Sequence, residues 1–250
     1  MSHKRLRVGV AGWGIASRYV GEIPNIGSNL ERYAQAFSAA EITTSFYRHH
    51  QLATYQRWAD SVGDGFRFSV KTPRALTHEG ALVHGKSAVL DRFVSEVTGL
   101  GRKLRALLVQ LPPSLEFIAA DSAKFFKRLR RSIPSSVAIV CEPRHESWGS
   151  SAADALLKDL GVSRVAADPA RWTRDAAPGG DLRLAYFRMH GTPRIYFSRY
   201  EPPALETLTR QLQGAIHSSA EVWCIFDNTA HGHAIGNALG IQRTLRTEWQ

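Results

Sequence analysis

Strand-length apolar segments recur along this chain, and most are separated by a segment with helical periodicity. The strand segments are residues 6–12, 41–47, 66–71, 106–111, 137–142, 164–168, 184–190 and 222–228. The helical segments are residues 29–37, 54–62, 87–100, 121–131, 152–160, 204–216 and 234–245. Strands that alternate with helices pair in parallel through right-handed crossovers, and eight such units close into a barrel. We therefore predict an α/β fold, a single (β/α)8 TIM-like barrel domain over residues 1–250, with an irregular loop at 169–181 replacing the helix after the sixth strand.

The composition is that of a globular protein without a membrane segment. The chain has 250 residues, a length that barrels reach as one unit, and 44% of them are hydrophobic. No apolar run approaches the ~18 residues of a membrane span, and the basic start passes directly into the first strand segment, so we expect a cytoplasmic location. Cys141 and Cys224 lie inside apolar strand segments, which predicts buried free thiols.

The formal net charge of +10 favours an anionic partner. The most basic stretch, residues 124–131, has Phe125, Phe126 and Leu129 at helical spacing. This spacing indicates an amphipathic outer helix with a solvated basic face rather than a nucleic-acid contact. We therefore favour a small anionic molecule as the partner over nucleic acid.

The alternation of side chains along each strand identifies what points into the barrel. With Phe66, Phe68 and Val70 packed outward against helices, Arg67, Ser69 and Lys71 face inward. The same argument, with Ile42 and Phe46 also outward, turns the following residues inward: Glu41, Thr43, Ser45, Tyr47, Gln110, Glu142, Asp168, Arg188 and His190. The eighth strand offers either Asp227 or Asn228. Because ionisable groups are costly in an idle core, we predict a functional pocket at the strand ends, with a closed salt-bridge network as the alternative.

These residues suggest acid–base chemistry. Glu142, Asp168, His190 and Lys71 are the candidate catalytic residues, because burial and neighbouring charges can move their pKa values. Lys71 could also form a Schiff base, although a charged lysine that binds a substrate anion is the simpler interpretation if Glu142 or Asp168 is within reach. Candidate substrate-binding residues are Tyr47, Arg48, Gln110, Arg144, Trp148, Arg188, Tyr196, Tyr200, Asn228 and Thr229.

The loops after the seventh and eighth strands suggest an anion site. Barrels often bind phosphate there, where backbone N–H groups at a helix start lack internal partners. We predict such a site from Arg188, the Gly191-Thr192 turn and the Asn228-Thr229 segment.

Two other functions fit the same residues. A metal-dependent phosphodiester hydrolase would take its ligands from Glu41, His78, Glu142, Asp168, His190, His231 and His233, but no compact ligand motif supports it, and we predict neither a metal nor another cofactor. A non-enzymatic barrel could use the same cations only to recognise phosphate in a nucleic acid or metabolite. We prefer an enzyme with acid–base chemistry on a small anionic or phosphorylated substrate, in which Arg188 and Lys71 bind charge and Glu142, Asp168 or His190 moves protons, and we keep the other two functions as alternatives.

Short motifs after most of the strand segments resemble those of the YecE-like family, domain of unknown function 72, over nearly the whole chain. They are Gly12-Trp13, Glu41–Arg48, Phe68–Lys71 with Thr77-His78, Gln110–Pro113, Glu142–Arg144 with Ser147-Trp148, Arg188–Gly191 with Tyr196 and Tyr200, and Phe226–Thr229 with Gly232, Ala234, Asn237 and Ala238. The resemblance implies a TIM-like barrel with its pocket at the strand ends, but no reaction, substrate or cofactor. This chain departs from the family pattern at Ala11, Thr43 and His49-His50.

Overall fold

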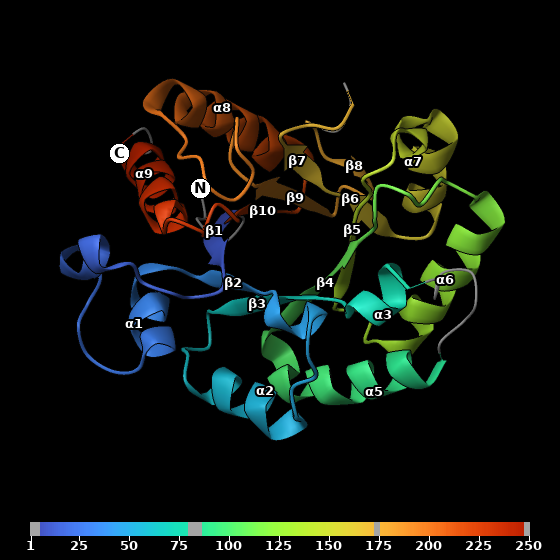
Figure 1. Cartoon of the computed structure of the whole chain (residues 1–250), viewed down its shortest axis with the longest axis horizontal. Helices are drawn as coiled ribbons and strands as arrows, with labels where there is room; N and C mark the ends of the chain where they lie inside the picture. The colour runs from blue at the N-terminus through green and yellow to red at the C-terminus, as the bar shows by residue number, and fades with distance from the viewer. Residues whose placement is uncertain (1–5, 80–86, 173–175, 248–250) are drawn as a thin grey trace.

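The computed structural model describes residues 6–79, 87–172 and 176–247, in which a ring of helices surrounds a parallel sheet (Figure 1). The strands are β1 Leu6–Ala11, β2 Ala39–Ile42, β3 Arg67–Lys71, β4 Leu104–Gln110, β5 Ala138–Glu142, β6 Val162–Arg164, β7 Ala166–Asp168, β8 Gly179–Gly180, β9 Leu184–Met189 and β10 Glu221–Phe226. The α-helices are α1 Asn29–Ala36, α2 Leu52–Asp60, α3 Arg74–Thr77, α5 Ser87–Val97, α6 Ala119–Ser132, α7 Ser151–Asp159, α8 Pro202–Ser218 and α9 His233–Thr247. Short 3-10 helices lie at Ser17–Glu22, Thr44–Phe46, Thr98–Lys103 and Glu146–Gly149.

The sixth strand segment closes the barrel by pairing with two different neighbours. Its first part, β6, pairs in parallel with β5, and its second part, β7, pairs in parallel with β9. Val165 lies between them, and its backbone N–H donates to the carbonyl of Cys141 at 2.8 Å. The sheet order runs β7-β9-β10-β1-β2-β3-β4-β5-β6-β8, so the two halves of one segment stand at the seam. The predicted TIM-like barrel is confirmed, and the short β8 is antiparallel to β6.

Two apolar layers confirm the alternation predicted along the strands. Phe68, Val70, Leu107 and Ile139 pack outward in the large cluster that joins strands to helices. A smaller cluster fills the barrel interior and includes Leu108, Val140, Tyr186, Trp223 and Ile225. In α6, Phe125, Phe126 and Leu129 are buried, which confirms the amphipathic helix expected from the basic stretch.

A partly buried carboxylate closes the amino-terminal end of the barrel. Glu221 at the start of β10 accepts hydrogen bonds from Arg7 Nε at 3.0 Å, Arg105 Nε at 2.7 Å and Trp223 Nε1 at 2.8 Å. These bonds tie β1, β4 and β10 together across the barrel. The charges at this end therefore stabilise the closure and leave the carboxyl-terminal end as the place for chemistry.

The second strand ends earlier than the sequence predicts. β2 stops at Ile42 and the chain turns into a 3-10 helix, in which Ser45 Oγ donates to the carbonyls of Ile42 at 3.2 Å and Lys71 at 2.6 Å. This turn breaks the alternation, so Phe46 does not join the helix layer as predicted. Its ring instead stands over the Lys71 amino group, with Nζ 4.1 Å from the ring centroid.

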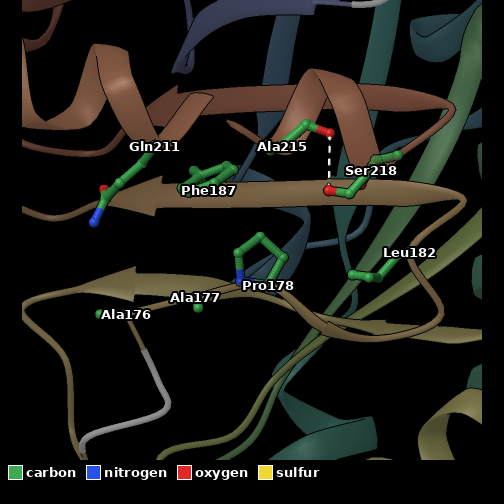
Figure 2. Close-up of a pocket in the computed structure, with 9 residues that line it drawn as sticks. Ala176, Ala177, Pro178, Leu182, Phe187, Gln211, Ala215 and Ser218 are labelled. Carbon is green, nitrogen blue, oxygen red and sulfur yellow. Dashed lines mark hydrogen bonds between the residues drawn. The ribbon is translucent and has the colours of Figure 1, made fainter. Parts of the chain in front are cut away.

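The loop that replaces the sixth helix leaves a cavity in the outer layer, away from the ends of the strands. It measures about 220 Å³ and lies between residues 176–182 of the loop, Phe187 of β9 and the last turns of α8 (Figure 2). Cys141 and Cys224 are buried and not disulfide-bonded, as predicted. Over the described residues, no helix has both the length and the apolar character needed to cross a membrane.

A candidate active site at the carboxyl-terminal ends of the strands

Arg188, near the end of β9, is the centre of a buried ionic network. Its Nη2 donates to Glu41 Oε1 at 2.6 Å, and its Nε lies 3.0 Å from the same oxygen. Its Nη1 donates to Glu142 Oε2 at 2.9 Å, and Nη2 also lies 2.9 Å from Asp227 Oδ2. Three carboxylates, from β2, β5 and the end of β10, therefore surround one guanidinium, whose side chain is only 1% exposed.

His190 joins two of these carboxylates. Its Nδ1 lies 3.0 Å from Asp227 Oδ2 and its Nε2 lies 2.8 Å from Glu142 Oε1. Arg144 Nη2 reaches the same Glu142 oxygen at 2.6 Å and passes 3.1 Å from His190 Nε2. Because carboxylates only accept hydrogen bonds, a protonated His190 ring would donate from both nitrogens.

The cations keep the buried carboxylates ionised. Burial by itself would raise the pKa of Glu142, but the charges of Arg144, His190 and Arg188 hold that pKa well below its ordinary value. The same two effects oppose each other at Asp227. Burial raises its pKa, but the charges of Arg188 and His190 have the larger effect, so the pKa lies below its ordinary value. These two carboxylates therefore remain charged near neutral pH and do not titrate as acids or bases there.

The network extends to the middle of the barrel through neutral groups. Tyr186, two residues before Arg188 on the same side of β9, donates from its hydroxyl to Glu41 Oε2 at 2.8 Å. Ser69 Oγ lies 2.7 Å from that hydroxyl. Burial, followed by the Glu41 charge, raises the pKa of Tyr186 well above its ordinary value, so the phenol stays protonated and continues to donate.

Lys71 lies at the edge of this network and forms no ion pair of its own among the described residues. Arg144, Arg188 and His190 contact the carboxylates of Glu41, Glu142 and Asp227, whereas the Lys71 amino group contacts none of the three. Its side chain is buried, the residue being 8% exposed, and within the described part of the chain its Nζ makes no hydrogen bond or ion pair. Burial first, and then the charge of Arg188, lower the pKa of Lys71 to about 8.

Phe46 contacts both Lys71 and His78. The Phe46 ring covers Nζ and lies edge-to-face against His78, with ring centroids 5.0 Å apart. His78 Nδ1 is 2.8 Å from Thr77 Oγ1. Burial, then the charges of Lys71, Arg74 and Arg144, lower the pKa of His78, so this imidazole is largely neutral at pH 7.

The Asp168 carboxylate does not join the other side chains of the predicted acid–base set. Its Oδ1 accepts hydrogen bonds from Thr192 Oγ1 at 2.6 Å and Tyr200 Oη at 2.7 Å, and its carbonyl accepts from the His190 N–H at 2.7 Å. These bonds fix the loop after β9. Among the described residues, its carboxylate makes no hydrogen bond or ion pair with Lys71, Glu142 or Arg188, because the neighbouring loop already uses it.

The residues proposed to bind substrate divide into two groups. Arg144 and Arg188 belong to the ionic network, Gln110 lies at its edge with Oε1 3.5 Å from Arg188 Nη1, and Tyr196 faces His190 with ring centroids 5.8 Å apart. The remaining candidates either are engaged in packing, as are Trp148, Tyr200 and Asn228, or stand exposed on the rim, as do Tyr47, Arg48 and Thr229.

Tyr196 has an unusual backbone. Its φ of 70° makes it the one non-glycine residue with positive φ among those described. Its backbone N–H donates to the His190 carbonyl at 2.6 Å, and its carbonyl accepts from the Ala230 N–H at 3.1 Å. These bonds hold a strained residue at the mouth of the network, a position where strain is often functional.

The anion site predicted from Arg188 and the two neighbouring loops is corrected by these contacts. The guanidinium is already enclosed by carboxylates, so it is not presented to a ligand. The Gly191 N–H donates to Tyr200 Oη at 2.8 Å, and Asn228 Nδ2 donates to Asn237 Oδ1 at 2.8 Å. These two loop donors are therefore engaged by hydrogen bonds within the fold.

The residues considered as metal ligands do not form a common site. In residues 6–79, 87–172 and 176–247, no group of three His, Cys, Asp or Glu side chains is arranged to hold a metal ion. Glu41, Glu142 and Asp227 converge on Arg188, whose guanidinium occupies the centre between them. The His231 and His233 rings lie on the rim, 6.1 Å apart.

Sequence reasoning missed Asp227, Phe46 and the role of Glu41. Asp227 was half of an undecided pair, and the bond of Asn228 to Asn237 at 2.8 Å now shows which of the two faces inward. The signal for Glu41 was present, because it shares the inward parity, but only its partner Arg188 identifies its role as a counter-ion. No sequence pattern signals that Phe46 covers Lys71.

A family model described as "Protein of unknown function DUF72" matches residues 7–250 of this chain. The UPF0759 protein YecE of Escherichia coli (strain K12) is 31% identical over 85 residues, a match that spans 34% of this chain and 31% of YecE. The UPF0759 protein YunF of Bacillus subtilis (strain 168) is 22% identical and covers 97% of this chain and 95% of its own length.

The crystal structure of a DUF72 family protein from Enterococcus faecalis has a similar fold. It superposes with a TM-score of 0.82 at 20% identity and covers 96% of this chain and 95% of that one. At this identity the similarity establishes the barrel and its chain path, and nothing about chemistry.

Proposed function

The chain belongs to the DUF72 family, whose description assigns no reaction, and we propose from the site itself that the protein is an enzyme in which Lys71 moves a proton on a small anionic substrate. One observation carries this proposal: at the strand ends, Lys71 is buried and, among the described residues, no carboxylate forms an ion pair with its amino group. With a pKa of about 8, the side chain holds both ammonium and amine near neutral pH. General acid–base catalysis is most efficient when the pKa lies near the working pH.

The residues around Lys71 would have distinct roles. Glu142, Asp227 and Arg188 form a rigid charged wall that does not itself exchange protons near pH 7. Tyr196 is 39% exposed at the mouth. Burial and then the Asp227 charge raise the pKa of Tyr196, so its hydroxyl keeps its proton and can donate to a substrate oxygen.

The preference for an anion rests on Arg144. Its side chain is 7% exposed, its Nη2 serves Glu142 and its Nε has no hydrogen-bond partner within the described residues. A buried N–H without an acceptor is costly, and a substrate carboxylate or phosphate would satisfy it. The net charge of +10 would help to attract such a substrate.

Hydrogen exchange at carbon tests this proposal without knowledge of the natural reaction. The protein is incubated in D2O with a panel of small oxo acids, hydroxy acids and sugar phosphates, and loss of C–H signals is followed by proton NMR. We expect exchange in at least one compound, slowed at least ~100-fold in Lys71→Met, since a positioned acid–base group contributes roughly 10²–10⁴-fold. Arg199→Met is the matched control and should leave the rate unchanged, because Arg199 is exposed and its one ion pair in the described part of the chain is with Glu201.

Three results would contradict the proposal. Exchange that persists in Lys71→Met would assign the chemistry to another group. Binding of panel compounds without any exchange would favour the alternative of a non-enzymatic binding barrel. Exchange that appears only after addition of Mn²⁺ or Zn²⁺ would instead favour the metal-dependent alternative.

A further inference from the structure

We propose that Lys71 is a covalent nucleophile and that its substrate is a small aldehyde or ketone carrying an anionic group, held as an imine during the reaction. This inference rests on the proposed function and adds the substrate class. Its basis is that the Lys71 amino group makes no hydrogen bond or ion pair with the described residues.

Every carboxylate that could neutralise Lys71 is already engaged by other groups. Glu142 is shared by Arg144, Arg188 and His190, and Asp227 by Arg188 and His190. Glu41 is held by Arg188 and Tyr186. Asp168 is held by Thr192 and Tyr200. Glu142, Glu41 and Asp227 still raise the pKa of Lys71, but burial and the charge of Arg188 lower it more, and none of these carboxylates forms an ion pair with its amino group.

Lys103 provides a comparison within the same chain. It is buried to the same degree as Lys71, 9% against 8% exposed, but its Nζ donates to the carbonyls of Ala59, at 2.6 Å, and Val62. An ammonium held by carbonyls has no lone pair to offer, whereas the Lys71 amino group faces only the Phe46 ring among the described residues. The structure thus separates a structural buried lysine from one whose amine is free to react.

The chemistry balances with groups at the site. The Lys71 lone pair attacks the carbonyl carbon, and a proton leaves the nitrogen while one is taken up by the carbonyl oxygen, which gives a carbinolamine. The hydroxyl of the carbinolamine then takes up a proton and departs as one water, while the nitrogen keeps its second proton, which leaves a protonated C=N bond. His78, next to Phe46 and held by Thr77 at 2.8 Å, is a largely neutral imidazole suited to carry these protons.

An imine explains why proton transfer would follow at this site. The protonated C=N bond withdraws electrons from the neighbouring carbon, so a C–H bond there becomes acidic. The anionic group of the substrate would accept the hydrogen of Arg144 Nε, which has no partner in the described part of the chain.

Reductive trapping tests the inference. The full chain is incubated at pH 7.5 with cyanoborohydride and one of three carbonyl compounds: pyruvate, dihydroxyacetone phosphate, or uncharged acetone. Peptide mass spectrometry then locates the reduced adduct. We expect adducts on Lys71 at least tenfold faster than on the exposed Lys124 and Lys127, and none on Lys103. The carboxylate and phosphate arms distinguish which anion is preferred, and Arg144→Gln should reduce the advantage of both over acetone.

The outcomes separate this inference from the proposed function. Labelling of Lys71 at or below the rate of Lys124 would overturn it, even if carbon exchange still depends on Lys71, in which case the lysine is a base only. Equal labelling by acetone and by both anionic compounds would remove the anionic part of the substrate class. Circular dichroism of Lys71→Arg, which should form no adduct at position 71, verifies that loss of labelling is not loss of fold.

Discussion

Replacing Arg188 by methionine should lower the free energy of unfolding by about 3–5 kcal/mol or prevent folding altogether, because removing one partner of a buried ion pair leaves uncompensated charge. The guanidinium is 1% exposed and is the only group that contacts all of Glu41, Glu142 and Asp227 within the described residues. Urea denaturation at pH 7, followed by circular dichroism, measures the loss.

A second readout is specific to Glu142 and Asp227. Without Arg188, the folded-state pKa values of both should rise, because each loses one of the cations that lower it, so the stability deficit of the variant relative to the wild type should shrink as the pH falls through these pKa values. Arg102→Met is the matched control, since Arg102 is exposed and its one ion pair within the described residues is with exposed Asp64. A loss below about 1 kcal/mol, the range of surface ion pairs, would contradict the described network. If Arg188→Met does not fold, Arg188→Lys, which keeps one charge but cannot span three carboxylates, should fold with reduced stability.

Replacing Lys71 by methionine should have the opposite effect and raise the free energy of unfolding by about 3 kcal/mol at pH 7, since one pKa unit corresponds to about 1.4 kcal/mol. The pKa of Lys71 is lowered to about 8 in the folded chain, first by burial and then by Arg188. In the unfolded chain it is about 10.4. Methionine fills a similar volume beside Phe46 and removes the buried charge.

The pH dependence identifies the cause of this gain. Below pH 8 the wild type carries the full cost of a buried ammonium, and between pH 8 and about 10.4 the folded state releases the proton and the cost disappears. The difference between variant and wild type should therefore shrink from pH 7 to pH 9.5. A variant that is less stable than the wild type at pH 7, or a difference independent of pH, would mean that Lys71 is a structural cation.

The alternation of side chains was sufficient to predict which residues enter the barrel. Phe68 and Val70 pack outward, and Lys71, Glu142 and Arg188 face inward as the pattern requires. This works because a strand buried on both sides must separate its apolar and polar residues by parity. The predicted strand ends also placed these residues at one end of the barrel.

The pairing among these residues could not be read from the sequence. The alternation of side chains does not predict that the carboxylate closest to Arg188 is Glu41, 147 positions earlier. Nor does it predict that Asp168 accepts a hydrogen bond from Tyr200. The second strand failed for a local reason, because the hydroxyl of Ser45 bonds to two carbonyls and ends the extended backbone at Ile42. That turn brings Phe46 over Lys71, a long-range contact with no local signal.

The ionisation of Lys71 shows whether Arg188 engages the three carboxylates and leaves this amine without an ion pair. Competitive acetylation across pH 6–11, read by peptide mass spectrometry, gives the pKa of each lysine in the folded protein. We expect half-maximal reactivity of Lys71 near pH 8, while the exposed Lys124 and Lys127 titrate with the ordinary lysine pKa of about 10.4. If Lys71 instead titrates together with Lys124 and Lys127, its charge is neutralised in the folded protein and the proposed chemistry has no basis.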